Sequence, residues 1–262
     1  MSYVFAKDQI GLDRAKMLHS VFAGSSESFL SEFGEKGKNL ILDLGCGPGY
    51  TTRTVSKTLA PKMIIGLDNS DSFIEQAKIF SKDIQGIEFQ THDITHIPFP
   101  VTQADGIYFR FVLTHMQDKF GSLFNWSTQL KTKGMILLEE TESIHTENPA
   151  FIKYMDIADN LLKSNNNQLY IGKQLNAQNY SPHFTKKTSR ISRVGATSSK
   201  AADLFQYNIL AWREQKFVQD NYSNQELDDL ENEIQQLRNS KDSAIVIEWS
   251  IRQMVLIKSN ST

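Results

Sequence analysis

The stretch Ile41-Leu-Asp-Leu-Gly-Cys-Gly-Pro-Gly-Tyr50 decides the fold. It is a short apolar run that contains one acid, Asp43, and ends in glycines at alternate positions, Gly45, Gly47 and Gly49. A segment with helical spacing follows. This order predicts a strand, a tight loop and a helix. A loop of this kind lets a ligand lie directly against the backbone, because no side chain stands in the way.

On either side of this loop the pattern alternates between strand and helix. The spacing predicts strands over residues 39–44, 63–67, 87–90, 104–109 and 134–138, and helices over 49–59, 70–82 and 118–131. Strands that alternate with helices at this spacing indicate an α/β fold with a parallel sheet and helices on both faces.

The outer parts of the chain follow other patterns. Residues 1–34 have helical spacing, with breaks expected near Gly24 and Gly34. The alternation stops at Thr141. Beyond it, helices are expected over 147–163, 169–179, 198–219 and 224–239, a basic strand over 183–194, and a long apolar last strand over 244–258. We interpret residues 1–262 as a single domain with a helical arm (1–34), a ligand-binding half (35–140), a helical cap (141–180) and a C-terminal half that completes the sheet (181–262).

Composition limits the classes of protein to consider. The chain has 262 residues, of which 40% are hydrophobic, enough for a substantial core. Its net charge of −2 gives no general attraction to nucleic acid or to an anionic membrane. The single cysteine excludes an internal disulfide framework, and no apolar signal core or membrane span is apparent. We therefore expect a cytoplasmic protein without a membrane or nucleic-acid partner.

Acidic residues lie at the ends of the next two expected strands. Asp68 closes the second strand about 20 residues after Gly47, a spacing that suits a carboxylate accepting the hydroxyls of a ribose. Asp93 follows the third strand, where it could accept a hydrogen bond from the exocyclic amine of a base. Because the carboxyl ends of parallel strands meet at one edge of a sheet, these acids should lie together. A ribose and an amino-bearing base together indicate an adenosine.

A dinucleotide is the competing interpretation. Its loop is Gly-x-Gly-x-x-Gly, with the pyrophosphate at a helix N-terminus, whereas this chain has Gly-x-Gly-x-Gly preceded by Asp43. A carboxylate there would repel a pyrophosphate and attract a cationic group. S-adenosylmethionine carries an ammonium and a sulfonium, so electrostatics favour it over NAD. In a purely structural alternative, the glycines only form a tight turn and Asp43 only caps the loop.

At these residues the chain resembles the class I S-adenosylmethionine-dependent methyltransferases of the bacterial small-molecule type. The likeness covers about residues 35–140 and consists of five motifs: Ile41–Tyr50, Gly66–Ser70, Asp93–Phe99, Ala104–His115 and Lys131–Leu137. A looser likeness to one bacterial branch involves Tyr3-Val-Phe, Leu12-Asp-Arg14 and Tyr170–Leu175. The resemblance implies a doubly wound, mostly parallel, seven-stranded Rossmann-like sheet. It also implies an antiparallel last strand, N-terminal helices and a helical cap inserted after strand five.

The resemblance also implies roles for particular residues. Two groups of residues would hold S-adenosylmethionine or its product S-adenosylhomocysteine. The first would contact the methionine end and the second would contact the adenosine. Arg110 would line the sulfonium side. The first group is Asp43, Gly45, Cys46 and Gly47, and the second is Asp68, Asn69, Asp93 and Ile94. Arg14 in the arm could pair with the cofactor carboxylate or be a solvated residue.

A general base is needed only if the acceptor loses a proton during the reaction. His115, just past the fourth strand, is the best candidate; alternatively, it lines the pocket or stabilises a turn. Weaker candidates are Glu139, Glu140 and His145, of which the two glutamates could also bind a cation or face solvent. His92 and His96 flank Asp93, but no zinc pattern is present, so no metal is expected.

The acceptor should be recognised by the arm and the cap, which would lie over the strand ends. Four residues could line an apolar pocket or simply pack the cap onto the sheet: Phe151, Tyr154, Met155 and Tyr170. A basic set could attract an acidic substrate or form a solvated strand: Lys186, Lys187, Arg190 and Arg193.

The predicted function is transfer of a methyl group to O, N or C of a small-molecule acceptor by in-line displacement, in a monomer or homodimer. The alternatives are a methyltransferase-fold binding module without turnover, a protein or RNA methyltransferase, and an NAD-dependent dehydrogenase.

Overall fold

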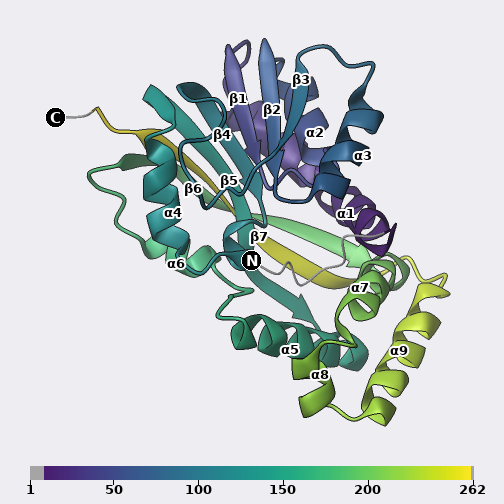
Figure 1. The fold of residues 1–262 in the computed structure, drawn as a ribbon. Helices are drawn as coiled ribbons and strands as arrows, with labels where there is room; N and C mark the ends of the chain where they lie inside the picture. The colour runs from purple at the N-terminus through teal and green to yellow at the C-terminus, as the bar shows by residue number, and fades with distance from the viewer. Residues whose placement is uncertain (1–8, 261–262) are drawn as a thin grey trace.

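The computed structural model describes residues 9–260, which form a twisted seven-stranded sheet flanked by helices (Figure 1). The strand order is β3-β2-β1-β4-β5-β7-β6. Strands β1 to β5 pair in parallel, whereas β7 is antiparallel to both β5 and β6. This confirms the expected mostly parallel sheet with an antiparallel last strand. The strands are β1 (Leu40–Leu44), β2 (Met63–Asp68), β3 (Ile87–Thr91), β4 (Ala104–Arg110), β5 (Leu130–Thr146), β6 (Phe184–Thr197) and β7 (Ile245–Lys258).

The helices connect these strands and precede the first of them. A short 3-10 helix, η1 (Leu113–His115), follows β4. The α-helices are α1 (Gln9–Phe33), α2 (Tyr50–Leu59), α3 (Asp71–Ser81), α4 (Lys119–Ser127), α5 (Pro149–Ser164), α6 (Gly172–Ala177), α7 (Ser198–Trp212), α8 (Lys216–Asn221) and α9 (Asn224–Arg238). Within residues 9–260, none of these helices is long and apolar enough to cross a membrane.

The strand order reverses between β1 and β4, so the chain passes to opposite sides of β1 at this point. In a doubly wound sheet, such a switch point opens a crevice at the carboxyl ends of the strands. The loop after β1, the end of β2 and the end of β4 all lie there, because neighbouring strands are parallel and in register, with Leu44 opposite Leu67 and Asp43 opposite Tyr108. The fold therefore brings the acids and glycines of the sequence motifs to one edge.

Several element boundaries differ from the predictions. Helix α1 continues through Gly24, where an added Cβ would meet nothing, because buried side chains on both sides, Phe22 and Phe29, anchor it. Helix α4 ends at Ser127, and Leu130 already pairs with Ala104 in the sheet. The helix expected over 198–219 is divided into α7 and α8.

Strand β5 differs most, because it extends to Thr146 instead of ending near residue 138. The antiparallel partner β7 pairs with β5 along the whole extension. The pairing runs from Met135 opposite Ile257 to Thr146 opposite Ile247. In Figure 1 the long strands β5, β6 and β7 project beyond the parallel half and have α5, α7, α8 and α9 at their far end.

The packing of the helices against the sheet forms two large apolar clusters. One lies between the parallel strands and their helices and includes Leu42, Ile107 and Trp126. The other contains residues of α5, α7, α9 and the far ends of the long strands, among them Phe205 and Trp249. Helices α7 to α9, which follow β6, therefore pack with α5, so the helical layer at this end is larger than the predicted cap over 141–180.

Candidate functional site

The loop between β1 and α2 has left-handed backbone at all three of its glycines. The φ angles are 64° at Gly45, 53° at Gly47 and 81° at Gly49. A Cβ at Gly45 would lie 2.7 Å from Val112 Cγ2, and one at Gly49 would lie 2.7 Å from Phe89 Cζ. A Cβ at Gly47 would meet nothing within 4 Å, and Gly47 lines a cavity. Two of the glycines therefore permit close packing, and the third leaves space beside the backbone.

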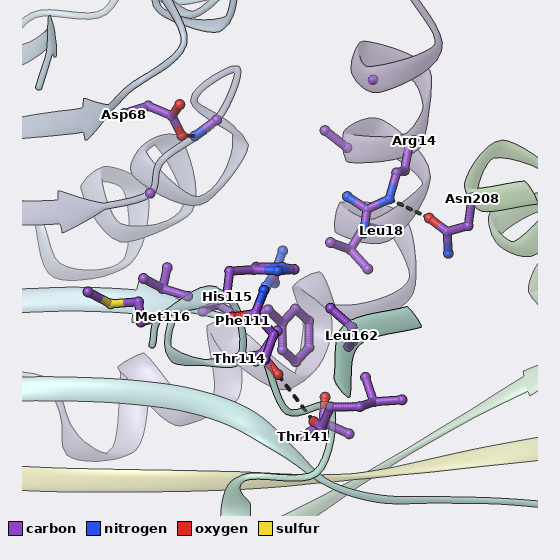
Figure 2. A pocket seen from close by; sticks show the side chains of 18 of the residues that line it. Arg14, Leu18, Asp68, Phe111, Thr114, His115, Met116, Thr141, Leu162 and Asn208 are labelled. Carbon is purple, nitrogen blue, oxygen red and sulfur yellow. Dashed lines mark hydrogen bonds between the residues drawn. The ribbon is translucent and has the colours of Figure 1, made fainter. Parts of the chain in front are cut away.

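Asp68, at the end of β2, links this loop to α3. Its Oδ2 accepts a hydrogen bond from the backbone N–H of Gly47 (2.9 Å), and its Oδ1 accepts one from the N–H of Ser70 (2.9 Å). The side chain of Ser70 caps α3 by accepting from the N–H of Phe73. Asp68 and Asn69 both line the cavity, and Figure 2 shows the bond between Asp68 and the loop. A carboxylate oxygen can accept more than one hydrogen bond, so Asp68 can hold the loop and also receive a ligand hydroxyl.

Asp43 lies beneath the loop and not on the cavity lining. Its side chain is 1% exposed, and its Oδ2 accepts hydrogen bonds from the hydroxyls of Thr51 and Thr52, each 2.7 Å away. Burial raises its pKa to about 7, although the two hydroxyls oppose the shift. This placement does not support the expected direct contact with a ligand. The carboxyl instead fixes the junction of β1 and α2.

The residues expected on the adenine side lie on the cavity lining. Asp93 Oδ1 accepts from the N–H (2.9 Å) and the hydroxyl (2.7 Å) of Thr95. Partial burial would raise the pKa of Asp93, but these bonds outweigh it and the pKa is lowered. Ile94 lines the cavity, and its carbonyl accepts from the indole of Trp126 (2.9 Å). Cys46 also lines the cavity, and burial raises the pKa of its thiol.

Arg110 joins β4 to α1 at the cavity. Its Nη1 donates to Ser26 Oγ (2.8 Å), and the guanidinium carbon lies 6.0 Å from the ring centre of Phe22 and 5.6 Å from that of Phe111. Its charge also helps burial lower the pKa of His19 to about 4. Arg110 therefore supplies a fixed positive charge between the glycine loop and the N-terminal helix.

His115 ends η1 and lines the cavity beyond β4. Burial, followed by the charge of Arg14, lowers its pKa to about 3. Its imidazole is therefore neutral near pH 7. A group with so low a pKa is a weak proton acceptor, so this environment argues against the general-base role and favours one in lining the pocket.

The two glutamates at the end of the parallel part of β5 are buried and do not line the cavity. Glu139 accepts from the hydroxyl of Tyr108 (2.7 Å) and from Nε2 of Gln253 (2.8 Å). Glu140 Oε1 accepts from two backbone N–H groups at the start of η1, and burial raises its pKa to about 8. Neither faces solvent, contrary to one expectation. Both instead tie strands and loops together.

The histidines form no obvious metal site. His145 lies on β5 opposite Glu248 and is not on the cavity lining, and His92 contacts the carbonyl of His96 at 2.9 Å. In the part of the chain that the structure describes, no three His, Cys, Asp or Glu residues are arranged to hold a metal ion.

The cavity has a volume of about 430 Å³ and extends from the glycine loop to a chamber between α1, α5 and α7. Figure 2 shows Asp68 at one side and Arg14, Asn208 and Leu162 at the other, with His115 between them. Sites of this size are typical of small-molecule ligands. The chamber is mainly apolar, and its lining includes Phe22, Leu161, Leu162, Leu204, Phe205, Trp212 and Trp249.

Of the pocket residues expected from the cap, Tyr154 and Met155 line the chamber, whereas Phe151 and Tyr170 pack in the adjacent core. The contribution of α7 was not predicted. Its side chains Leu204, Phe205, Asn208 and Trp212 recur at helical spacing in the sequence, a signal that could have identified the lining face.

The expected basic set lies on β6, outside the cavity lining. Arg190 pairs with Glu32, and Arg193 lies 3.7 Å from Glu248. These contacts give two members of the set roles on the sheet surface and none in the cavity.

Comparison with known proteins identifies the part of the chain that carries the loop. Residues 42–138 match the family model of the methyltransferase domain. This part of the chain is a methyltransferase domain. The expected resemblance to the methyltransferases is confirmed for these residues, and the match spans every strand end that forms the loop side of the cavity.

Relatives of the methyltransferase domain act on different acceptors. The demethylmenaquinone methyltransferase of Staphylococcus saprophyticus is 29% identical over 113 residues, 43% of this chain and 48% of the relative. The trans-aconitate 2-methyltransferase of Enterobacter sp. is 27% identical over 118 residues, 45% of this chain and 44% of the relative. The matched segment thus spans about half of these relatives.

Solved structures share the fold over nearly the whole chain. The YcgJ protein of Bacillus subtilis covers 91% of this chain, and all of that protein, with a TM-score of 0.57 and 18% identity. The phosphoethanolamine N-methyltransferase 2 of Haemonchus contortus, solved with phosphomonomethylethanolamine and S-adenosylhomocysteine, has a TM-score of 0.58 and 15% identity. That alignment covers 96% of this chain and 58% of the other. At these identities the likeness concerns the fold alone.

Proposed function

We propose that this chain is an S-adenosylmethionine-dependent methyltransferase that acts on a small-molecule acceptor. The observation that carries the proposal is the continuity of the cavity. It joins the glycine loop and Asp68, at the switch point of the sheet, to an apolar chamber under the helices. A cofactor and an acceptor could therefore meet inside one enclosure.

The residues present fit this cofactor. Asp68 would accept the ribose hydroxyls, with Asn69 beside it, and Asp93 and Ile94 would face the adenine. The methionine end would lie along the backbone of Gly45, Cys46 and Gly47, where the space beside Gly47 admits close approach. Arg110 can attract the cofactor carboxylate, while Asp43 beneath the loop would favour its ammonium group.

The cofactor supplies a methyl group that is already activated on a cationic sulfur. The chain then has to align the acceptor and exclude water, since in-line displacement needs little else. The apolar side chains of α5 and α7 serve the second purpose. Because His115 is a weak base, the site favours an acceptor whose nucleophile is deprotonated before it binds.

The enclosed chamber favours a small molecule over a protein or RNA segment, and the acceptors named for the two curated relatives are small molecules as well. The continuity of this chamber with the cofactor side also favours turnover over a binding module. The experiment is a screen of carboxylates, phenols and amines in which release of S-adenosylhomocysteine is measured. Turnover with at least one class, lost in Asp68→Ala, is expected. Cofactor binding without release from any acceptor would support the binding-module alternative.

A further inference from the structure

A polar cluster interrupts the apolar chamber on the side opposite Asp68. Arg14 of α1 donates through Nε to Oδ1 of Asn208 on α7, and Nδ2 of Asn208 donates to the hydroxyl of Tyr154 on α5 (2.5 Å). All three residues line the cavity. Figure 2 shows Arg14 and Asn208 facing each other across the two helices. Three separate elements thus direct polar groups to one place.

Trp212 adds a further donor to this cluster. It lies one helical turn after Asn208 on α7, and its ring centre is 6.0 Å from that of Tyr154. Its Nε1 is buried and makes no hydrogen bond of normal length and angle among residues 9–260, although its proximity to the hydroxyl of Tyr154 opposes the raised pKa of that group. Buried N–H groups are nearly always paired, so one without a well-formed bond on a cavity wall can donate to a ligand.

The groups of the cluster that can reach a ligand are mostly donors. The guanidinium of Arg14 and the indole of Trp212 can only donate. The hydroxyl of Tyr154 accepts from Asn208, so its own proton is directed to another acceptor. The carboxylates on the cavity lining, Asp68 and Asp93, belong to the loop side at the ends of β2 and β3. The cluster is therefore positively charged and rich in donors.

We propose that the acceptor is an apolar carboxylic acid whose carboxylate binds to Arg14, Tyr154 and Trp212. This inference rests on the proposed function, since it names the class of acceptor for the same site. A carboxylate only accepts hydrogen bonds, so it complements all three donors and the charge of Arg14. Its apolar body would lie against Leu162 and Phe205. A neutral amide would instead place N–H groups of its own beside donors.

The test is isothermal titration of the full chain with 4-phenylbutanoate and with its uncharged analogue 4-phenylbutanamide, each with and without saturating S-adenosylhomocysteine. We expect the acid to bind about tenfold to a hundredfold more tightly than the amide, the effect of a hydrogen-bonded charge. Arg14→Gln should remove most of this preference. Trp212→Phe, which deletes the N–H and keeps an aromatic ring, should weaken binding of the acid more than that of the amide.

Trp249→Phe is the matched control, because Trp249 lines the same chamber from β7 and has no part in the cluster. Trp249→Phe should change the affinities for the acid and for the amide by the same factor. Failure of the acid to bind, equal affinities for acid and amide, or equal effects of Trp212→Phe and Trp249→Phe would each overturn the inference. The inference would also be overturned if Arg14→Gln no longer bound S-adenosylhomocysteine but still bound the acid more tightly than the amide. Arg14 would then bind the cofactor. A wild-type chain that does not bind S-adenosylhomocysteine would refute the proposed function, which separates the two failures.

Discussion

Replacement of Asp43 by asparagine should make the chain more stable at alkaline pH and not at acid pH. The carboxyl is 1% exposed and is held by two hydroxyls, and burial raises its pKa from 3.8 to about 7. The folded state therefore favours the protonated form. Asparagine has nearly the same shape and no charge, so Asp43→Asn removes the cost of the buried carboxylate and retains an oxygen that can accept from Thr51 or Thr52.

The size of the effect follows from the two pKa values. A shift from 3.8 to about 7 corresponds to at most about 4 kcal/mol in the free energy of unfolding. The raised pKa means that this cost is absent below pH 3.8, grows between pH 3.8 and 7, and is complete above pH 7. Relative to wild type, Asp43→Asn should therefore gain stability steadily as the pH rises through this window.

The assay is urea unfolding of both proteins at several values between pH 4 and pH 8. Asp105→Asn is a control whose stability difference should not follow the pH in this range. Burial alone would raise the pKa of Asp105, but Lys131 (2.8 Å) and the backbone N–H groups of Leu40 and Asn39 lower it. Because the pKa of Asp105 lies below 3.8 in the folded chain, its stabilisation is nearly complete by pH 4, so that variant should be less stable than wild type by a nearly constant amount between pH 4 and pH 8. A stability difference for Asp43→Asn that is flat or falls with pH would refute the reasoning.

Three further predictions concern packing and chemistry. Arg252→Met leaves Glu142 buried without its two hydrogen bonds (both 2.8 Å) and should lower the free energy of unfolding by about 3–5 kcal/mol, measured in urea; a loss below about 1 kcal/mol would contradict this. Gly49→Ala places a methyl 2.7 Å from Phe89 at a φ of 81°, so calorimetry should show a lower melting temperature, and an unchanged one would be inconsistent with the packing. If His115 has a pKa of about 3, His115→Gln should leave the shape of the pH–rate profile between pH 6 and pH 9 unchanged, whereas loss of a limb near pH 6.5 would restore the general-base role.

The sequence was most informative where local chemistry and strand ends coincide. The glycines of the loop and Asp68 could be placed because a parallel sheet brings its carboxyl ends to one edge, and the structure joins Asp68 directly to Gly47. Asp43 was harder to place. Its position in the strand was clear, but the side on which the carboxylate emerges depends on packing against Thr51 and Thr52 of α2.

The chamber could be predicted only in part. Its walls include residues from α1, α5 and α7, helices that are far apart in the sequence and meet because β5 and β7 extend beyond the parallel half. That extension depends on pairing between Thr146 and Ile247, a long-range contact that local periodicity does not show. The pKa of His115 likewise depends on burial by distant elements, so its residue type alone suggested a base.

The central claim is that the loop side of the cavity binds the methyl donor and its product. Isothermal titration of S-adenosylhomocysteine into the wild-type chain, Asp68→Ala and Asp71→Ala tests it most directly. Asp71 is the matched control because it lies in the first turn of α3, is exposed and does not line the cavity. The account predicts binding by wild type and Asp71→Ala, and a loss of at least about tenfold in Asp68→Ala, the effect of one charged hydrogen bond. No binding by the wild type at millimolar ligand, or equal affinity in all three proteins, would contradict it.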